Sequence, residues 1–233
     1  QQLLRIDEES AEPLDQGQSQ EILQIFENNL AGVDIVCLQD YDKGVLSAQL
    51  CKELIDLAAK ANKTVLVDPA ASGDYSKYTG AGVITPNRRE ASIAAEFDIQ
   101  TIDEAKLAAK TLSKKLGIEA VIITLDKEGM YLQKTDQSEH IQTIPRSVYD
   151  VTGAGDMVLA MLAVALAAGC DYKTAVQLAN IAGGIEVEKF GVATVTVDEI
   201  VNEIIAANHG KSGKIHDIET LINELAFHRQ QGD

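Results

Sequence analysis

A glycine-rich turn that leads straight into an apolar helix is the feature that most constrains this sequence. Residues 150–156 read D-V-T-G-A-G-D, and an unbroken apolar run covers residues 157–168. Glycine lets backbone N–H groups converge on one point, and the first turn of a helix adds unpaired donors and a positive dipole end. We therefore expect a site for anionic oxygen, formed by the amides of Gly153, Ala154 and Gly155. Asp156 beside it is suited to accept a proton from a hydroxyl that attacks phosphorus.

An ordinary structural turn is the alternative interpretation of this stretch. Glycine and aspartate are common at helix starts for conformational reasons alone. For an isolated G-x-G-D that explanation would be preferred, but the whole string followed by a buried helix favours the anion site.

Composition limits the classes of protein that the chain can belong to. Its 233 residues are 45% hydrophobic, enough for one α/β domain or two small ones. The 20 basic and 36 acidic side chains give a net charge of −16, which argues against nucleic acid or an anionic membrane as a partner. The three cysteines form no C-x-x-C pair, so we expect a cytoplasmic protein without disulfides or zinc.

Short apolar runs typical of buried strands alternate with stretches of helical spacing. The strands are expected at residues 1–7, 34–38, 64–67, 82–84, 120–125, 130–133 and 138–144, the last at a sheet edge. Helices are expected at residues 20–30, 47–61, 102–116, 171–189, 197–206 and 217–229, and residues 8–19 read as a loop.

Polar residues follow several of these strands, where ligands bind in open α/β sheets. Q-D-Y-D-K-G follows the strand at 34–38 and contains Asp40 and Lys43, which taken alone are a polar loop with a solvated lysine. T-P-N-R-R-E follows the strand at 82–84, and a capping box between Asn87 and Glu90 suffices to explain it as pure sequence. Residues 126–129 read as a β-turn in which Gly129 adopts positive φ.

Taken together, D-Y-x-K-G, T-P-N-x-x-E and D-V-T-G-A-G-D in this order resemble the ribokinase-like (PfkB-type) carbohydrate kinases, and among them the heptose 7-phosphate kinases. The resemblance implies an α/β fold with a mostly parallel sheet flanked by helices. It also implies ATP and Mg²⁺ as cofactors, Asp156 as the general base and residues 153–155 as the anion hole. The expected reaction is phosphorylation of O1 of D-glycero-β-D-manno-heptose 7-phosphate, on the route to ADP-heptose and lipopolysaccharide.

The same resemblance assigns further residues to the site. Both Asp40 and Lys43 are assigned to substrate binding, Lys43 as a contact of the sugar phosphate and Asp40 as an active-site acid, and Glu90 is expected to hold Mg²⁺ through water. The expected nucleotide contacts are Asn87, Arg88, Arg89, Glu90, Thr124, Asp126, Gly129, Asn180 and Gly183.

Two departures from the family pattern matter. Ala70 and Ala71 follow Asp68-Pro69, where the family has a basic residue. The resemblance starts partway into a kinase, so we expect a partial kinase domain at residues 1–207. Residues 208–233 are then a linker and short helix towards an adenylyltransferase domain that the sequence lacks. The exposed sheet edge expected from this truncation makes a homodimer feasible.

Two alternatives stay open at this stage. The chain could be a ribokinase-like kinase for another sugar or a nucleoside, since the Asp156 loop does not discriminate among acceptors. It could also act, as this fragment, as a non-catalytic nucleotide-binding or assembly module.

Overall fold

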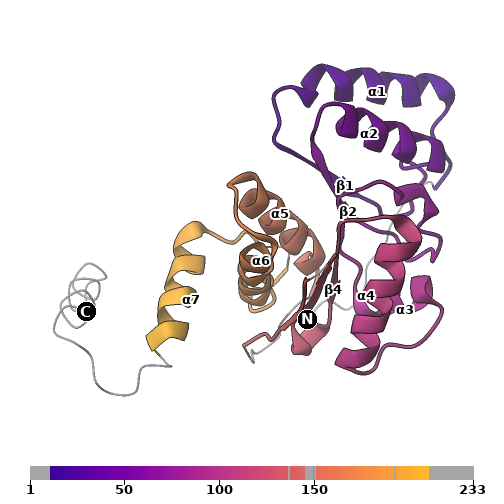
Figure 1. The fold of residues 1–233 in the computed structure, drawn as a ribbon. Helices are drawn as coiled ribbons and strands as arrows, with labels where there is room; N and C mark the ends of the chain where they lie inside the picture. Colours follow the sequence, from indigo (N-terminus) through magenta and orange to yellow (C-terminus); the bar gives the residue numbers. More distant parts are fainter. Residues whose placement is uncertain (1–10, 136, 145–148, 150, 192, 210–233) are drawn as a thin grey trace. The chain divides into compact units, whose positions relative to one another are not determined.

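A computed structural model describes residues 11–135, 137–144, 149, 151–191 and 193–209 (Figure 1). The chain divides into two compact units, Gln1–Thr194 and Val195–Asp233. The second unit contains helix α7 (Val197–His209), which Thr196 and Glu199 cap through reciprocal hydrogen bonds. None of the helices in the described ranges is long and apolar enough to cross a bilayer.

The first unit is built on one mixed sheet whose six strands follow each other in chain order. The strands are β1 (Ile35–Gln39), β2 (Thr64–Asp68), β3 (Val83–Ile84), β4 (Ala120–Thr124), β5 (Met130–Lys134) and β6 (Gln137–Ile141). The first four are parallel, and β5 and β6 are added as antiparallel strands. This arrangement confirms the predicted sheet, with β6 at an edge.

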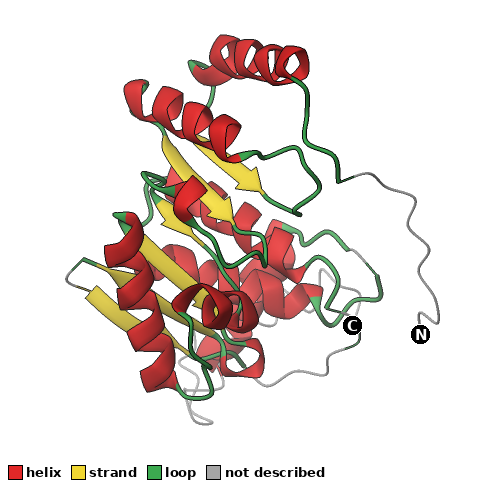
Figure 2. Cartoon of the chain, turned by 90° about the vertical axis from the view of Figure 1, so that its right-hand side faces the viewer, coloured by secondary structure: helices red, strands yellow, loops and turns green. Residues whose placement is uncertain are grey.

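Helices cover both faces of the sheet (Figure 2). One apolar cluster joins Val36, Val65 and Ile84 to residues of α2 (Ala48–Lys60) and α4 (Ile102–Leu116). A second joins Leu66 and Ile122 to residues of α5 (Ala154–Ala167) and α6 (Tyr172–Glu186). Because successive strand residues point to opposite faces, this pattern assigns the odd and even positions of each strand to one cluster or the other.

The expected loop at residues 8–19 is wrong at its end, because α1 (Gln16–Leu30) begins four residues earlier than predicted. Asp15 accepts from the Gln18 amide at 2.8 Å, and the Gln18 side chain accepts from the Asp15 amide at 3.0 Å. This reciprocal capping box stabilises the helix start although glycine, a poor helix former, occupies position 17 in the first turn. The elements expected at residues 1–7 and 217–229 lie outside the described residues.

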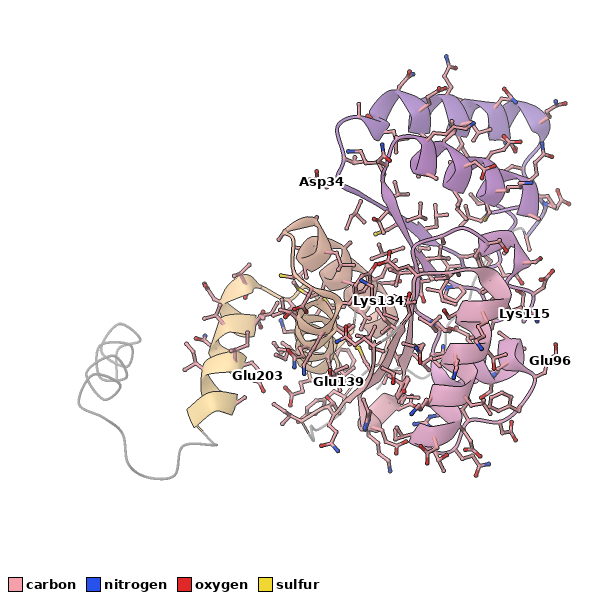
Figure 3. All side chains as sticks on the ribbon, viewed as in Figure 1. Asp34, Glu96, Lys115, Lys134, Glu139 and Glu203 are labelled. Atoms are coloured by element: carbon pink, nitrogen blue, oxygen red, sulfur yellow. The ribbon has the colours of Figure 1, made fainter. Side chains whose placement is uncertain are left out.

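The other predicted elements agree with the structure within a few residues. Helix α6 starts after Asp171, whose carboxylate accepts from the Thr174 amide at 2.7 Å, and it ends at Glu186 rather than at 189. The capping box expected before α3 (Arg88–Ala95) is present. Charged side chains lie on the outer surfaces of the helices, such as the labelled pair Glu96 and Lys115, 3.8 Å apart (Figure 3).

Candidate active site at the carboxyl edge of the sheet

Polar side chains at the carboxyl ends of the parallel strands meet around Asp68. Asp68 ends β2 on the face that α5 and α6 cover. Its carboxylate accepts hydrogen bonds from the Gln39 side-chain Nε2 at the end of β1 and from the Thr85 hydroxyl, 3.3 Å away, just after β3. The sheet therefore presents one acidic group, fixed by two neighbours, at the edge where ligands of α/β proteins bind.

The N-terminus of α5 lies against the same edge. Gly153 caps the helix with φ of 97°, a left-handed conformation that favours glycine. A Cβ on Gly155 would lie 3.5 Å from Asp68 Oδ2, so the first turn of α5 and the end of β2 are neighbours. The Ala154 amide makes a long 3.4 Å bond to the Val151 carbonyl. Helix geometry leaves the next two amides, those of Gly155 and Asp156, without an acceptor inside the helix.

Asp156 is exposed in the first turn of α5 and receives a hydrogen bond from another element. The Tyr41 hydroxyl, in the loop after β1, donates to Asp156 Oδ1 at 2.7 Å. This bond raises the pKa of Tyr41 to about 12, with burial and the charge of Asp68 adding to it. Burial raises the pKa of Asp68, hydrogen bonds from Gln39 and Thr85 oppose the rise, and the charge of Asp156 adds to it. The edge thus holds two interacting carboxyl groups, a phenol donor and helix amides.

Asn87 and Glu90 cap α3 reciprocally, as a pure capping box requires. The Asn87 amide donates to Glu90 Oε2 at 2.8 Å, and the Glu90 amide donates to Asn87 Oδ1 at 2.9 Å. Burial raises the pKa of Glu90, and the charge of Asp68 raises it further. Glu90 is therefore close enough to Asp68 for the two charges to repel each other.

The described residues do not form a metal site made of protein side chains only. No group of three or more His, Cys, Asp or Glu side chains there could hold a metal ion. Mg²⁺ typically keeps several waters and binds one or two carboxylates together with substrate phosphates. Glu90 and Asp68 could serve in that way.

Arg88 and Arg89 differ sharply in their surroundings. Arg89 is exposed at the start of α3. The Arg88 guanidinium joins α3 to the β4–β5 turn and to the chain after α3, through the Glu128 carboxylate, Asp126 Oδ2 at 3.2 Å, Leu125 O at 3.0 Å and Ile99 O at 3.3 Å. Its donors are therefore largely taken by protein acceptors, and a nucleotide contact by Arg88 stays a prediction.

The end of β4 connects the Asn87 motif to the following turn. The Thr124 amide donates to the Pro86 carbonyl at 3.0 Å, and Asn87 pairs with Thr124 in an isolated parallel bridge. Gly129 closes the turn with φ of 91°. Thr124 is thereby held beside the start of α3, and nucleotide contact stays a prediction for Thr124, Asp126 and Gly129.

Gly183 and Asn180 on α6 already have contacts within the protein. A Cβ on Gly183 would lie 3.1 Å from Val158 Cγ2, so this glycine allows α6 to pack closely on α5. Asn180 Nδ2 donates to the Gln142 carbonyl at 3.0 Å, which ties α6 to the chain after β6. Close packing explains Gly183, and nucleotide contact stays a prediction for both residues.

Asp40 is buried in the loop after β1. Its carboxylate binds Lys77 Nζ at 2.6 Å, the Tyr78 hydroxyl at 2.7 Å and the Asp42 amide at 2.9 Å. Lys43 is exposed in the same loop. A hollow of about 350 Å³ borders this loop, with Asp40, Asp42, Ser47, Ser72, Asp74 and Lys77 among its lining residues.

Three residues of this region were missed by sequence reasoning. Tyr41 lies inside the D-Y-x-K-G motif but received no role, although that motif was the available signal. Asp68 received no role either, although its position directly after the predicted strand at 64–67 was a signal. Lys77 follows β2 by nine residues and carries no motif that would pair it with Asp40.

Comparison with known proteins gives a family and a set of relatives. The family model described as pfkB family carbohydrate kinase matches residues 2–199. The bifunctional protein HldE of Trichlorobacter lovleyi is 41% identical over 233 residues, which are 100% of this chain and 47% of that protein. HldE of Campylobacter fetus is 41% identical over 222 residues, covering 95% of this chain and 47% of that protein. The chain spans about half the length of the curated relatives it matches.

Solved structures confirm the ribokinase-like fold. Phosphofructokinase-2 from Escherichia coli in complex with potassium has a TM-score of 0.72 at 17% identity, covering 84% of this chain and 63% of that one. Ribokinase from Thermotoga maritima has a TM-score of 0.62 at 26% identity, covering 77% and 59%. Arabidopsis thaliana ribokinase complexed with ribose and ATP has a TM-score of 0.68 at 22% identity, covering 82% and 59%.

Proposed function

The chain belongs to the pfkB family of carbohydrate kinases, and on that premise we propose that it transfers the γ-phosphoryl group of ATP to a sugar hydroxyl. We propose D-glycero-β-D-manno-heptose 7-phosphate as the acceptor and its O1 as the attacking atom. The relatives named HldE and the D-Y-x-K-G motif support this choice over other sugars.

One observation carries the proposal: Asp156 and the first amides of α5 lie at the carboxyl edge of the parallel strands, next to Asp68. In the proposed reaction Asp156 takes the proton of the attacking hydroxyl. The amides at residues 153–155 offer donors to the oxygens of the transferring phosphoryl group. This pairing suits phosphoryl transfer because the carboxylate accepts the proton of the hydroxyl while the amides stabilise the negative charge of the phosphoryl oxygens.

The residues fit a water-shelled Mg²⁺ with ATP. Burial raises the pKa of both Asp68 and Glu90, and a neighbouring carboxylate raises each further, while the charge of Arg89 opposes the rise at Glu90. Glu90 and Asn87 would hold the ion through its waters. When bound, Mg²⁺ neutralises the charge of the nucleotide phosphates. We propose Thr124, Asp126, Gly129 and Arg89 as neighbours of the nucleotide on the same edge.

Acceptor binding is proposed at the loop after β1. Lys43 is exposed there and supplies a cation for the sugar phosphate. Asp40 would hold this loop in place and not contact the acceptor, because its carboxylate is already bound by Lys77 and Tyr78. Ala70 and Ala71 offer no cation, so Lys43 carries more of this recognition than in family members with a basic residue there.

Asp156→Asn in the natural full-length protein tests the base directly. We expect kcat to fall by at least about a thousandfold, because the amide cannot accept the proton, while calorimetry still detects ATP binding. Asp103→Asn is the matched control, since Asp103 is also an exposed acid in the first turn of a helix. Near-normal turnover of Asp156→Asn would remove Asp156 from the base role.

An ADP-release assay with several acceptors tests the substrate. We expect heptose 7-phosphate to give a higher kcat/KM than ribose, fructose 6-phosphate or a nucleoside. Preference for one of these would assign the chain to another branch of the family. ATP binding without turnover on any acceptor would favour a non-catalytic nucleotide-binding module.

A further inference from the structure

The Tyr41 hydroxyl connects two motifs that lie far apart in the sequence. Tyr41 belongs to D-Y-x-K-G, and its hydroxyl donates to Asp156 Oδ1 at 2.7 Å across 115 residues of chain. The Tyr41 side chain is 60% exposed, so packing alone does not hold its ring in place. The position of the hydroxyl must depend on the loop that carries it.

That loop is anchored immediately on both sides of Tyr41. The preceding residue, Asp40, is buried and binds Lys77 Nζ at 2.6 Å and the Tyr78 hydroxyl at 2.7 Å. The following residue, Asp42, donates its amide to Asp40 Oδ1 at 2.9 Å and has φ of 57°. The backbone is therefore fixed at residues 40 and 42, which directs the Tyr41 side chain towards α5.

Repulsion from a neighbouring carboxylate explains why Asp156 needs a hydrogen-bond donor. The charge of Asp156 helps to raise the pKa of Asp68, so the two carboxylates are near neighbours, and like charges repel. Without a compensating donor, repulsion favours Asp156 orientations that point away from the sheet edge. The Tyr41 hydroxyl supplies a donor that holds Oδ1 in place.

We propose that Tyr41 is a positioning residue for Asp156: its hydroxyl fixes one carboxylate oxygen, so that the other faces the acceptor hydroxyl. This inference rests on the proposed role of Asp156 as the base. The proton moves from the acceptor hydroxyl to Asp156 Oδ2, and Tyr41 keeps its own proton throughout. The Asp156 hydrogen bond raises the pKa of Tyr41 to about 12, so the phenol remains a donor at neutral pH.

A titration of tyrosinate absorbance tests the contact without any assay of activity. In a pH-jump measurement, made before alkaline unfolding, we expect one tyrosine of Asp156→Asn to ionise about one pH unit lower than in the wild type. The Tyr41→Phe/Asp156→Asn double variant should lack that step. An unchanged titration in Asp156→Asn would show that the contact is absent in solution and would overturn the proposal.

Steady-state kinetics of Tyr41→Phe in the natural full-length protein test the consequence. We expect kcat to fall about 10- to 100-fold with both KM values within about twofold, because the ring remains but the carboxylate is no longer oriented. Tyr172→Phe is the matched control, because the Tyr172 phenol also lies beside a carboxylate, that of Glu119, at the opposite end of β4. Its turnover should match the wild type.

The possible outcomes separate this inference from the proposed function. Wild-type kcat in Tyr41→Phe, or a raised KM with kcat unchanged, would overturn the positioning role and leave Asp156 as the base. Normal turnover in Asp156→Asn would overturn both, while the titration would still report whether the two side chains meet.

Discussion

Gly129 approaches Ile141 so closely that no side chain fits between their backbones. A Cβ on Gly129 would lie 2.1 Å from the Ile141 carbonyl oxygen and 2.7 Å from the Thr143 nitrogen. Gly129 also has φ of 91° and ψ of −130°, a region that is open to glycine almost alone. We predict that Gly129→Ala lowers the free energy of unfolding by about 3 kcal/mol, from clash and strain together. Urea denaturation measures the loss.

Gly117→Ala is the control for backbone strain without a clash. Gly117 has φ of 64°, and a Cβ there would meet nothing within 4 Å. That variant should cost only about 1 kcal/mol. Equal losses in the two variants would mean that the close approach to Ile141 does not decide the residue at position 129.

Local sequence signals were enough to predict much of the fold and part of the site. The Asn87–Glu90 cap and the turn at Gly129 depend on residues within four positions of each other. The strands β1 to β4 were recognisable because each is a short apolar run, and β2 to β4 are buried on both faces. These signals predict the parallel strands of the sheet. They also predict the strand ends at which the candidate site lies.

Contacts between distant residues could not be read in the same way. The Tyr41–Asp156 bond spans 115 residues, and the Asp40–Lys77 pair joins two loops that share no motif. Asp40 was assigned to the site as an acid by the family resemblance of the motif that follows β1. Its burial depends on Lys77 and Tyr78, whose location is set by the loop after β2 and not by any local pattern. Tertiary contacts of this kind require the folded chain.

Glu90→Gln separates capping from metal binding. Glutamine at this position keeps the capping box but removes the charge. If Glu90 holds Mg²⁺ through water, we expect the Mg²⁺ concentration for half-maximal turnover to rise about tenfold, with little change in stability. Assays at fixed ATP over a range of Mg²⁺ concentrations measure this.

Glu104→Gln is the matched variant for that experiment. Glu104 closes the same kind of capping box at the start of α4, where it accepts from the Thr101 amide at 2.8 Å. Its Mg²⁺ dependence should equal that of the wild type. If Glu90→Gln behaves in the same way, capping is the whole role of Glu90.

Arg88→Lys tests whether the main role of this arginine is to stabilise the fold by joining α3 to the β4–β5 turn. Lysine cannot reproduce the planar set of donors that reaches Asp126, Leu125 and Ile99. We predict that the variant loses about 1–2 kcal/mol of unfolding free energy in urea. Arg89→Lys, at the exposed neighbouring position, should stay within about 0.5 kcal/mol of the wild type. A larger loss in Arg89→Lys than in Arg88→Lys would contradict the assignment.

The Asp40–Lys77 pair predicts a pH-dependent stability. Burial acts to raise the pKa of Asp40, but the bonds from Lys77, Tyr78 and Asp42 and the charge of Lys77 outweigh it, so the pKa is lowered. The ionised carboxylate therefore stabilises the fold at any pH above the pKa of an unfolded aspartate, about 4. This stabilisation is lost as the pH falls through the lower pKa that Asp40 has in the folded protein. We predict that Asp40→Asn costs about 3 kcal/mol at pH 7, because it leaves Lys77 buried without its counterion.

Urea denaturation at pH 7, 5 and 3.5 follows that loss. The difference between Asp40→Asn and the wild type should persist at pH 5 and narrow below about pH 4, where the carboxylate of the unfolded wild-type chain takes up a proton before the folded one does. Glu139→Gln is the control, because Glu139 pairs with Lys173 at 2.7 Å while both side chains stay partly exposed, at 33% and 45%. An exposed pair of this kind should contribute less than about 1 kcal/mol at any of these pH values. A cost of Asp40→Asn that does not change with pH would mean that the shape of the side chain matters there and its charge does not.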